Sequence, residues 1–256
     1  MTIVSHEHKF IFLKTMKTAG TSVEMALAPH LGDDDTFSSG QIVHDAGYRK
    51  RHHAKTRIHH FRPADLVGVV RGLMDDQFHR NRGDGTTGRW KRLLHLRQHA
   101  SACEVQRFVG RVEWNDYWKV CFERNPWDRM LSYYFFRKKA HGFEFSFEEW
   151  LRAALAGGER DRRRMFAQDV RNDQIYSIGK SIAVNRVYRY EDIDESFRDI
   201  AKRLNLQDTS LSKQNVGVRP EGRVHEFYTP ELQALVAEKL ELEVCAGNYT
   251  FPLEGG

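Results

Sequence analysis

The amino-acid sequence predicts an α/β protein with an open sheet that is flanked by helices. Three segments carry this prediction, at residues 10–27, 117–136 and 184–204, because each reads as a short apolar strand that runs into a helix. A chain that alternates strands and helices in this way forms a layered fold. Ligands of open α/β sheets bind just outside the carboxyl ends of the strands. The turns that follow these strands are therefore the first places to search for a functional site.

The first unit contains a loop of the size that holds a phosphate group. The apolar run at 10–13 predicts a buried strand, and a helical pattern continues through Val23. Backbone N–H groups at the start of a helix have no intrahelical partner, and together with the helix dipole they attract anions. Lys17 adds a positive charge, and Gly20 permits close approach of the backbone. Hydroxyl groups come from Thr18, Thr21 and Ser22. This loop is a predicted site for a phosphate-like group.

The loop is not a Walker A motif, because Lys17 precedes the single glycine, whereas a Walker A lysine follows the second of two glycines. An ordinary ATPase is therefore disfavoured. The loop taken by itself also fits a plain turn between a strand and a helix that carries a surface lysine. A second feature of the chain is needed to choose between these two interpretations.

The second unit provides such a feature. Residues 117–122 predict a mostly buried strand, and a helix is expected to follow, since Asn125 is a good N-cap and Pro126 suits the first helical position. Arg124 stands at the carboxyl end of this strand, and Ser132 lies inside the following helix. We expect Arg124 and the lysine of the first loop to face one anionic ligand, because the strand ends of an open sheet share an edge.

Helices are also expected in the second half of the chain. Ser146 begins a capping-box pattern, Asp194 is the expected N-cap of the helix in the third unit, and Thr229 begins a final amphipathic helix that reaches Leu240. The loop at 214–223 contains Gly, Pro and two arginines. It fits either an exposed connector or a loop that covers a ligand.

Residues 36–96 show only a weak pattern, and we predict a mostly helical insertion there within a single domain that spans 1–256. Between residues 46 and 64 the chain has ten Lys, Arg or His residues and no acid. Such a run is usually a solvated basic face, although it also suits the guidance of an anionic substrate. The histidines of this stretch raise the question of zinc, but no Cys or carboxylate accompanies them at ligand spacing. A metal site is therefore not expected.

The composition, with 40% hydrophobic and 29% charged residues among 256, is that of a soluble globular protein. No apolar run approaches the ~20 residues that cross a bilayer, and the N-terminal stretch lacks the apolar core of a signal peptide. We therefore expect no transmembrane segment and a cytoplasmic location. The three cysteines are widely spaced and odd in number, which argues against a disulfide scaffold, and each is expected to be a small core residue.

Taken together, these segments resemble the sulfotransferases of the membrane-type, carbohydrate class that use 3′-phosphoadenosine 5′-phosphosulfate (PAPS), and especially their soluble bacterial relatives. The resemblance covers nearly the whole chain outside residues 36–96. It rests on KTMKTAGTSVE at 14–24, HASACEV followed by VG at 99–110, WNDYWKVCFERNPWDRMLSYY at 114–134, and VYRYEDI followed by the later YTPEL. It implies a P-loop-like, three-layer fold with a central parallel sheet.

The resemblance also implies roles for particular residues. It assigns the 5′-phosphosulfate loop to Lys17, Thr18, Ala19, Gly20, Thr21 and Ser22. It assigns the 3′-phosphate to Arg124, Ser132 and, from the less securely aligned late loop, Arg219. His99 falls where relatives carry a histidine, and it is our candidate for the catalytic base, with Lys17 as the second catalytic residue. His59 and His60 are competitors for the role of base, and a surface histidine on a helix is the plain alternative for His99.

The expected activity is transfer of the sulfuryl group from PAPS to a hydroxyl of a saccharide or glycolipid, with adenosine 3′,5′-bisphosphate as the product. Such a transfer depends on positioning and on cations, and a histidine can accept the hydroxyl proton at neutral pH. No metal and no nucleic-acid partner is expected. The alternatives are a P-loop nucleotide kinase or hydrolase, for which a Walker lysine and a magnesium carboxylate are missing, and a basic nucleic-acid-binding protein.

Overall fold

The computed structural model describes residues 2–32, 34–37, 96, 98–156, 170–207, 210–211 and 224–252. The predicted insertion at 36–96 lies outside the described residues except at its two ends. The same holds for nearly all of the predicted loop at 214–223.

A five-stranded sheet with the order β3-β1-β2-β4-β7 forms the centre of the protein. Its strands are β1 Ile3–Ser5, β2 Phe10–Leu13, β3 Thr36–Phe37, β4 Trp118–Glu123 and β7 Arg186–Arg189. Strand β4 pairs in parallel with β2 on one side and with β7 on the other, which confirms the predicted parallel sheet of three strand–helix units. Strand β1 pairs antiparallel with both β2 and β3 and extends the sheet beyond the prediction.

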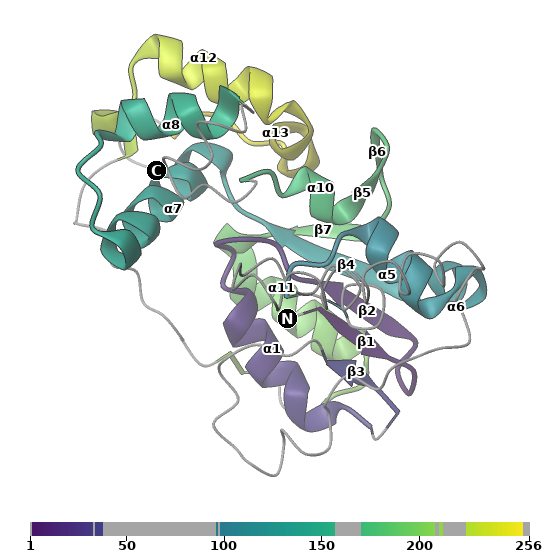
Figure 1. Cartoon of the computed structure of the whole chain (residues 1–256). Helices are drawn as coiled ribbons and strands as arrows, with labels where there is room; N and C mark the ends of the chain where they lie inside the picture. Colours follow the sequence, from purple (N-terminus) through teal and green to yellow (C-terminus); the bar gives the residue numbers. More distant parts are fainter. Residues whose placement is uncertain are drawn as a thin grey trace, which may run out of the picture.

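Helices cover both faces of this sheet (Figure 1). They are α1 Gly20–Leu27, α5 Ala102–Val109, α6 Arg111–Asp116, α7 Pro126–His141, α8 Phe147–Ala156, α10 Asp173–Tyr176, α11 Ile193–Arg203, α12 Pro230–Lys239 and α13 Glu241–Gly247. Short 3-10 turns lie at Ala28–His30, Tyr190–Asp192 and Val224–Phe227, and the strands β5 Ser177–Ile178 and β6 Ser181–Ile182 form a small hairpin. No helix among the described residues is long and apolar enough to span a bilayer.

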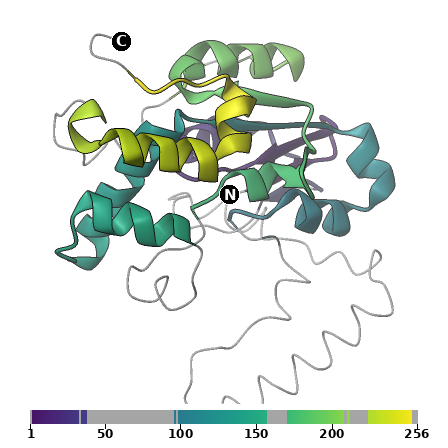
Figure 2. The same ribbon diagram turned by 90° about the horizontal axis from the view of Figure 1, so that it is seen from above.

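The alternation of side chains along β2 divides the core into two layers. Phe10 and Phe12 pack with α1 and α11, whereas Ile11 and Leu13 pack with the helices of the opposite face. Figure 2 shows the sheet between α11 on one side and α10 and α12 on the other. A strand that is apolar on both faces belongs in the middle of such a sandwich, which explains why the run at 10–13 has no polar residue.

The predicted helix starts are confirmed at three places. Asn125 caps α7 through a bond from the N–H of Trp127, Ser146 forms the predicted capping box ahead of α8, and Thr229 accepts from the N–H of Leu232 in α12. The prediction for Asp194 is wrong, because this residue lies inside the first turn of α11, whose N-cap position is Asp192.

The predicted final helix is confirmed as α12, and a second helix that the sequence reading did not predict, α13, follows it directly. Leu240 lies between the two, as the C-cap of α12 and the N-cap of α13, with a backbone outside the helical region. The cysteine prediction is also wrong in part, since Cys121 is buried but Cys103 and Cys245 are exposed on α5 and α13.

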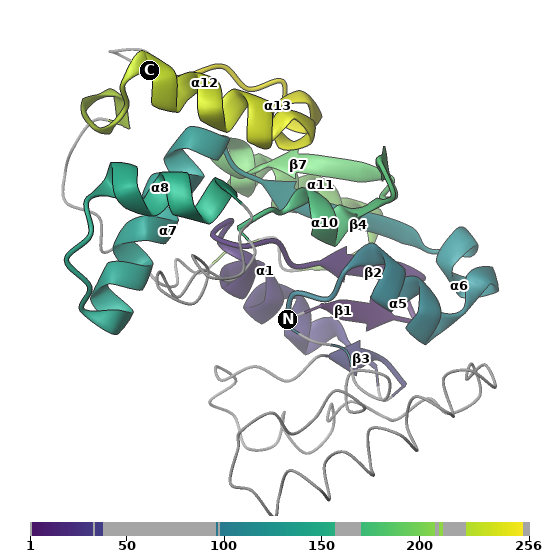
Figure 3. The ribbon, with the colours of Figure 1, turned by 45° about the horizontal axis from the view of Figure 1, so that its top comes forward.

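The helices α7, α8 and α12 gather at the carboxyl end of β4 (Figure 3). Leu13 pairs with Cys121 in the parallel register, so the chain leaves β2 and β4 at the same edge of the sheet. The hydroxyl of Thr15 donates to the carbonyl oxygen of Phe122, which ties the first loop to the end of β4. The register of two strands therefore brings the two predicted phosphate-binding turns together.

Candidate active site

The loop between β2 and α1 has an unusual backbone. Lys17 and Ala19 have φ angles of 62° and 53°, in the left-handed region that residues other than glycine seldom adopt. The carbonyl oxygen of Ala19 accepts from the N–H groups of Ser22 and Val23, so helix α1 begins directly after it. Residues held in such conformations persist only where surrounding contacts fix them, and they cluster at functional sites.

A second lysine lies beneath this loop. The ammonium of Lys14 donates to Glu24 at 2.8 Å and to Thr21 at 3.0 Å, and burial lowers its pKa to about 8. A Cβ atom on Gly20 would lie 2.7 Å from Cγ of Lys14, so the loop requires glycine where it crosses this side chain. Lys14 and Glu24 therefore form a buried ion pair that supports the loop below the predicted anion site.

Lys17 lies at the surface of the site against an aromatic ring. Its Nζ is 4.2 Å from the centre of the Phe136 ring, a distance typical of a cation–π contact. Burial, and second the positive charge of Arg124, lower the pKa of Lys17 to about 8. The positive charge of Arg124 beside Lys17 favours the binding of an anion between the two side chains.

Arg124 reaches the first loop, as the sequence predicts. Its Nη1 is 3.4 Å from the carbonyl oxygen of Lys17 and 3.4 Å from the hydroxyl oxygen of Ser132. Asp128 accepts from Nε at 2.6 Å and pairs with Nη2 at 2.5 Å, while the guanidinium carbon lies 4.5 Å from the centre of the Tyr190 ring. These contacts fix the plane of the guanidinium and bring Arg124, Ser132 and Lys17 into one site.

The threonines of the loop are bonded within the protein. The Thr18 hydroxyl lies 2.8 Å from that of Thr15, and Thr21 accepts from Lys14. Thr18 is only 1% exposed. These two hydroxyls stabilise the loop, and the backbone N–H groups at the start of α1 are better placed to contact an anion.

His99 is held at the base of the same loop. It lies in a turn ahead of α5, whose capping box is formed by Ser101 and Glu104, and not on a helix as the alternative interpretation expected. Its Nδ1 is 2.9 Å from the carbonyl oxygen of Lys14. Because a carbonyl can only accept, Nδ1 carries the proton in the neutral ring and Nε2 is the basic nitrogen.

Three residues of this site escaped the sequence reasoning. Lys14 had no signal, because a lysine that follows a strand usually lies in solvent. Phe136 lies one helical turn after Ser132, and this spacing alone could have placed both on the face that meets the loop. Tyr190 follows the end of β7, the strand beside β4, so its position beside Arg124 was also predictable from the sheet order.

Arg219, His59 and His60 lie outside the described residues. Among the residues that the structure describes, no group of three or more His, Cys, Asp or Glu side chains has an arrangement that could hold a metal ion.

Comparison with known proteins identifies the family. A sequence profile described as the sulfotransferase family matches residues 1–241. A sulfotransferase from Alicyclobacillus acidocaldarius is similar in structure, with 17% sequence identity, a TM-score of 0.42 and coverage of 94% of this chain and 96% of that chain. A search of curated proteins finds no match. The family profile extends over both of the turns that meet at the site. The chain belongs to the sulfotransferase family.

Proposed function

We propose that the protein transfers the sulfuryl group of PAPS to a hydroxyl of a saccharide or glycolipid acceptor. The observation that carries this proposal is the convergence of Arg124, Ser132 and Lys17 from two separate strand-to-helix turns. A donor with phosphate groups at both the 3′ and the 5′ position of adenosine requires two anion sites, and the two turns each offer a cationic side chain, Lys17 in the first and Arg124 in the second. A ligand with a single phosphate group would use only the first turn and would leave the position of Arg124 unexplained.

The loop between β2 and α1, which we call the donor loop, is suited to the 5′-phosphosulfate. Backbone N–H groups at the start of α1 and the ammonium of Lys17 together supply a positive field, and the buried ion pair of Lys14 with Glu24 supports the loop from below. Negative charge grows on the bridging oxygen as the bond from sulfur to that oxygen breaks. Lys17 can neutralise this charge, which lowers the barrier to transfer.

The Arg124 turn is suited to the 3′-phosphate. A guanidinium presents a rigid fork of donors to a phosphate, and Asp128 and Tyr190 hold that fork in a fixed orientation. Ser132 adds a hydroxyl donor beside it. A fixed second anchor of this kind orients the donor for an in-line displacement.

The acceptor hydroxyl must lose its proton as its oxygen bonds to sulfur. We assign this proton to Nε2 of His99, since Nδ1 is bonded to the Lys14 carbonyl oxygen. The products are then the sulfated acceptor, a protonated histidine and adenosine 3′,5′-bisphosphate. The three cysteines are free, which supports a reducing compartment such as the cytoplasm as the place of this reaction.

A thermal-shift comparison tests the proposed donor. Adenosine 3′,5′-bisphosphate is expected to raise the melting temperature, because a ligand that binds only the folded state stabilises it. ATP with magnesium and duplex DNA serve as the two comparison ligands. Stabilisation by ATP with magnesium alone would indicate a kinase or hydrolase, and stabilisation by DNA alone would indicate a nucleic-acid-binding protein. Incubation of candidate glycans with labelled PAPS then identifies the acceptor.

A further inference from the structure

The strained part of the donor loop is held from one side by a buried asparagine. Oδ1 of Asn172 accepts from the backbone N–H of Met16 at 2.8 Å, and Nδ2 donates to the backbone oxygen of the same residue at 3.2 Å. Both Asn172 and the contacts it makes are shielded from water, since Asn172 is 0% exposed. These two hydrogen bonds from Asn172 form a clamp on the backbone of Met16. Because Met16 directly precedes Lys17, the clamp acts next to a residue with a left-handed backbone.

The clamp is not an ordinary helix cap. Asn172 occupies the N-cap position of α10, yet its side chain makes no cap bond there. Glu243 of α13 takes over that role, because its Oε1 accepts from the backbone N–H groups of Asn172 at 2.6 Å and Asp173 at 3.1 Å. The asparagine side chain is thereby released to bond Met16. Asparagine favours N-cap positions through local bonds, so its use over a separation of 156 residues calls for an explanation.

A buried ionic network fixes the orientation of the amide. Nδ2 of Asn172 also donates to Oε1 of Glu123 at 3.0 Å. Arg129 lies between the two carboxylates, with Nε 3.3 Å from Glu123 and Nη2 bonded to Glu243. The flipped amide would place its oxygen against two acceptors, the Glu123 carboxylate and the Met16 carbonyl. Only one orientation of the side chain is therefore compatible with its surroundings.

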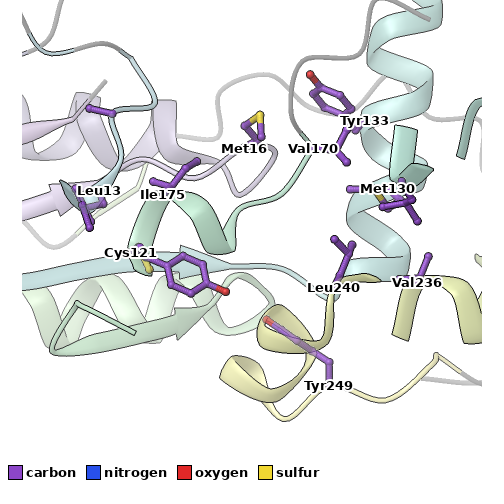
Figure 4. Packing of buried hydrophobic residues seen from close by; sticks show 14 of the residues in the cluster. Leu13, Met16, Cys121, Met130, Tyr133, Val170, Ile175, Val236, Leu240 and Tyr249 are labelled. Carbon is purple, nitrogen blue, oxygen red and sulfur yellow. The ribbon is translucent and has the colours of Figure 1, made fainter. Parts of the chain in front are cut away.

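The chemistry of the network explains why the clamp is an amide. Two carboxyl groups already share one guanidinium in a site shielded from solvent, and burial together with the charge of Glu243 raises the pKa of Glu123 to about 8. The site therefore disfavours further negative charge, and a neutral amide can bond both backbone atoms of Met16 without adding any. The side chain of Met16 lies in the same apolar cluster as Ile175 and Val170, which fixes the other side of the residue (Figure 4).

We propose that Asn172 is a positioning residue for sulfuryl transfer, which holds Met16 so that Lys17 keeps the backbone conformation of the donor loop. This inference rests on the proposed function, because it assigns Asn172 to the part of the site that receives the 5′-phosphosulfate. Asn172 acts through Met16 and touches no reacting atom. Asn172 and its network connect α10 and α13 to the donor loop, which α7 also contacts directly through Phe136.

The proposal predicts a loss of affinity that is larger at the 5′ end of the nucleotide than at the 3′ end. Adenosine 5′-monophosphate depends on the donor loop, whereas adenosine 3′-monophosphate depends on Arg124 and Ser132. In Asn172→Ala we expect affinity for the 5′-monophosphate to fall about tenfold, the loss that corresponds to one or two hydrogen bonds. Affinity for the 3′-monophosphate should fall less, by about twofold. The backbone N–H of Arg124 shares Oε1 of Glu123 with the clamp, but Asp128 and Tyr190 hold the guanidinium independently of Asn172.

The experiment is titration calorimetry on the full chain, with each monophosphate displacing adenosine 3′,5′-bisphosphate. Ile175→Ala is the matched control, because it removes buried apolar packing from the same short helix and the same cluster as Met16 but leaves both hydrogen bonds from Asn172 to the Met16 backbone in place. Ser132→Ala should show the reverse pattern, with loss of affinity for the 3′-monophosphate. Asn172→Ser is a milder variant for the case in which the alanine variant does not fold, because a water molecule can take the place of the amide.

Hydrogen exchange gives a second measurement. The Met16 amide should exchange faster in the Asn172 variants than in Ile175→Ala, because it loses its acceptor. Unchanged affinity for the 5′-monophosphate in Asn172→Ala would overturn the inference. Equal losses of affinity for the two monophosphates in Asn172→Ala, matched by the same losses in Ile175→Ala, would overturn it as well. If the wild-type protein binds none of the three nucleotides, the proposed function fails as well, so the two failures are distinguishable.

Discussion

Nδ1 of His99 lies 2.9 Å from the backbone oxygen of Lys14, a residue 85 positions earlier that also supports the donor loop through its ammonium. The same residue thus orients the candidate base through its backbone and supports the loop through the bonds of its ammonium to Glu24 and Thr21. The separation between the base and the loop is therefore fixed by one residue. This relationship makes the role of His99 open to a direct test.

His99→Ala should lower turnover by about 10²–10⁴-fold, the usual contribution of a general base, while affinity for adenosine 3′,5′-bisphosphate stays unchanged. The measurement is a transfer assay with labelled PAPS, together with calorimetry on the product nucleotide. His141→Ala, a change at an exposed histidine at the end of α7, is the control. Activity that survives in His99→Ala but is lost in His60→Ala would assign the base to His60.

Lys17→Ala and Arg124→Ala should each weaken binding of adenosine 3′,5′-bisphosphate by about ten- to hundredfold, since each removes a charged contact to a phosphate. Arg124→Lys should recover only part of the loss, because an ammonium cannot reproduce the fork of donors. Arg107→Ala on the exposed face of α5 should bind as the wild type does. Equal affinity in all of these variants would disprove the donor site.

Binding of the nucleotide should take up a proton near pH 8.5. Lys17 has a pKa of about 8 in the unliganded protein, and a phosphate beside it raises that pKa. Affinity should therefore fall as the pH rises above 8, by at most about tenfold per pH unit. Calorimetry in two buffers with different ionisation enthalpies measures the uptake, and Lys17→Met should reduce it. Identical uptake in the variant would assign the proton to another group.

The stability of the protein should decrease as the pH rises from 5 to 8. The folded state raises the pKa of Glu123 to about 8, mainly through burial, so it binds more protons than the unfolded state in this range. The contribution of Glu123 is at most about 1.4 kcal/mol per pH unit. Denaturant unfolding at several pH values should show a smaller slope in Glu123→Gln. The exposed change Glu148→Gln should keep the wild-type slope, and an unaltered slope in Glu123→Gln would contradict the assignment.

The parts of the fold that could be predicted from the sequence are those with local signals. The apolar run at 10–13, the cap formed by Asn125 and the capping box at Ser146 each specify an element through neighbours in the chain. Helix α5 has the same kind of signal, since Ser101 and Glu104 form a capping box, but the weak pattern around it concealed the helix. Strand β1 is three residues long and has no periodicity that could reveal it.

The residues of the candidate site also differ in whether local sequence signals could reveal them. Lys17 and Arg124 could be predicted because each follows a recognisable strand. The roles of Asn172 and Glu243 could not, because their partners lie 156 and 114 residues away and nothing near either residue distinguishes it from a polar surface residue. Arg129 has the spacing of a helix surface, and only the packing of α13 against α7 buries it completely. Contacts of this length depend on the tertiary fold rather than on sequence pattern.

The bond between Asn172 and Glu243 also has a consequence for biosynthesis. The donor loop ends at residue 22, but its clamp is completed by the carboxylate of Glu243, which the ribosome adds more than two hundred residues later. A nascent chain therefore carries this loop without its support while the residues between them are made. Contacts between residues this far apart in the sequence form late in folding. We therefore expect the backbone of the donor loop to reach its final conformation only after α13 has packed against α10.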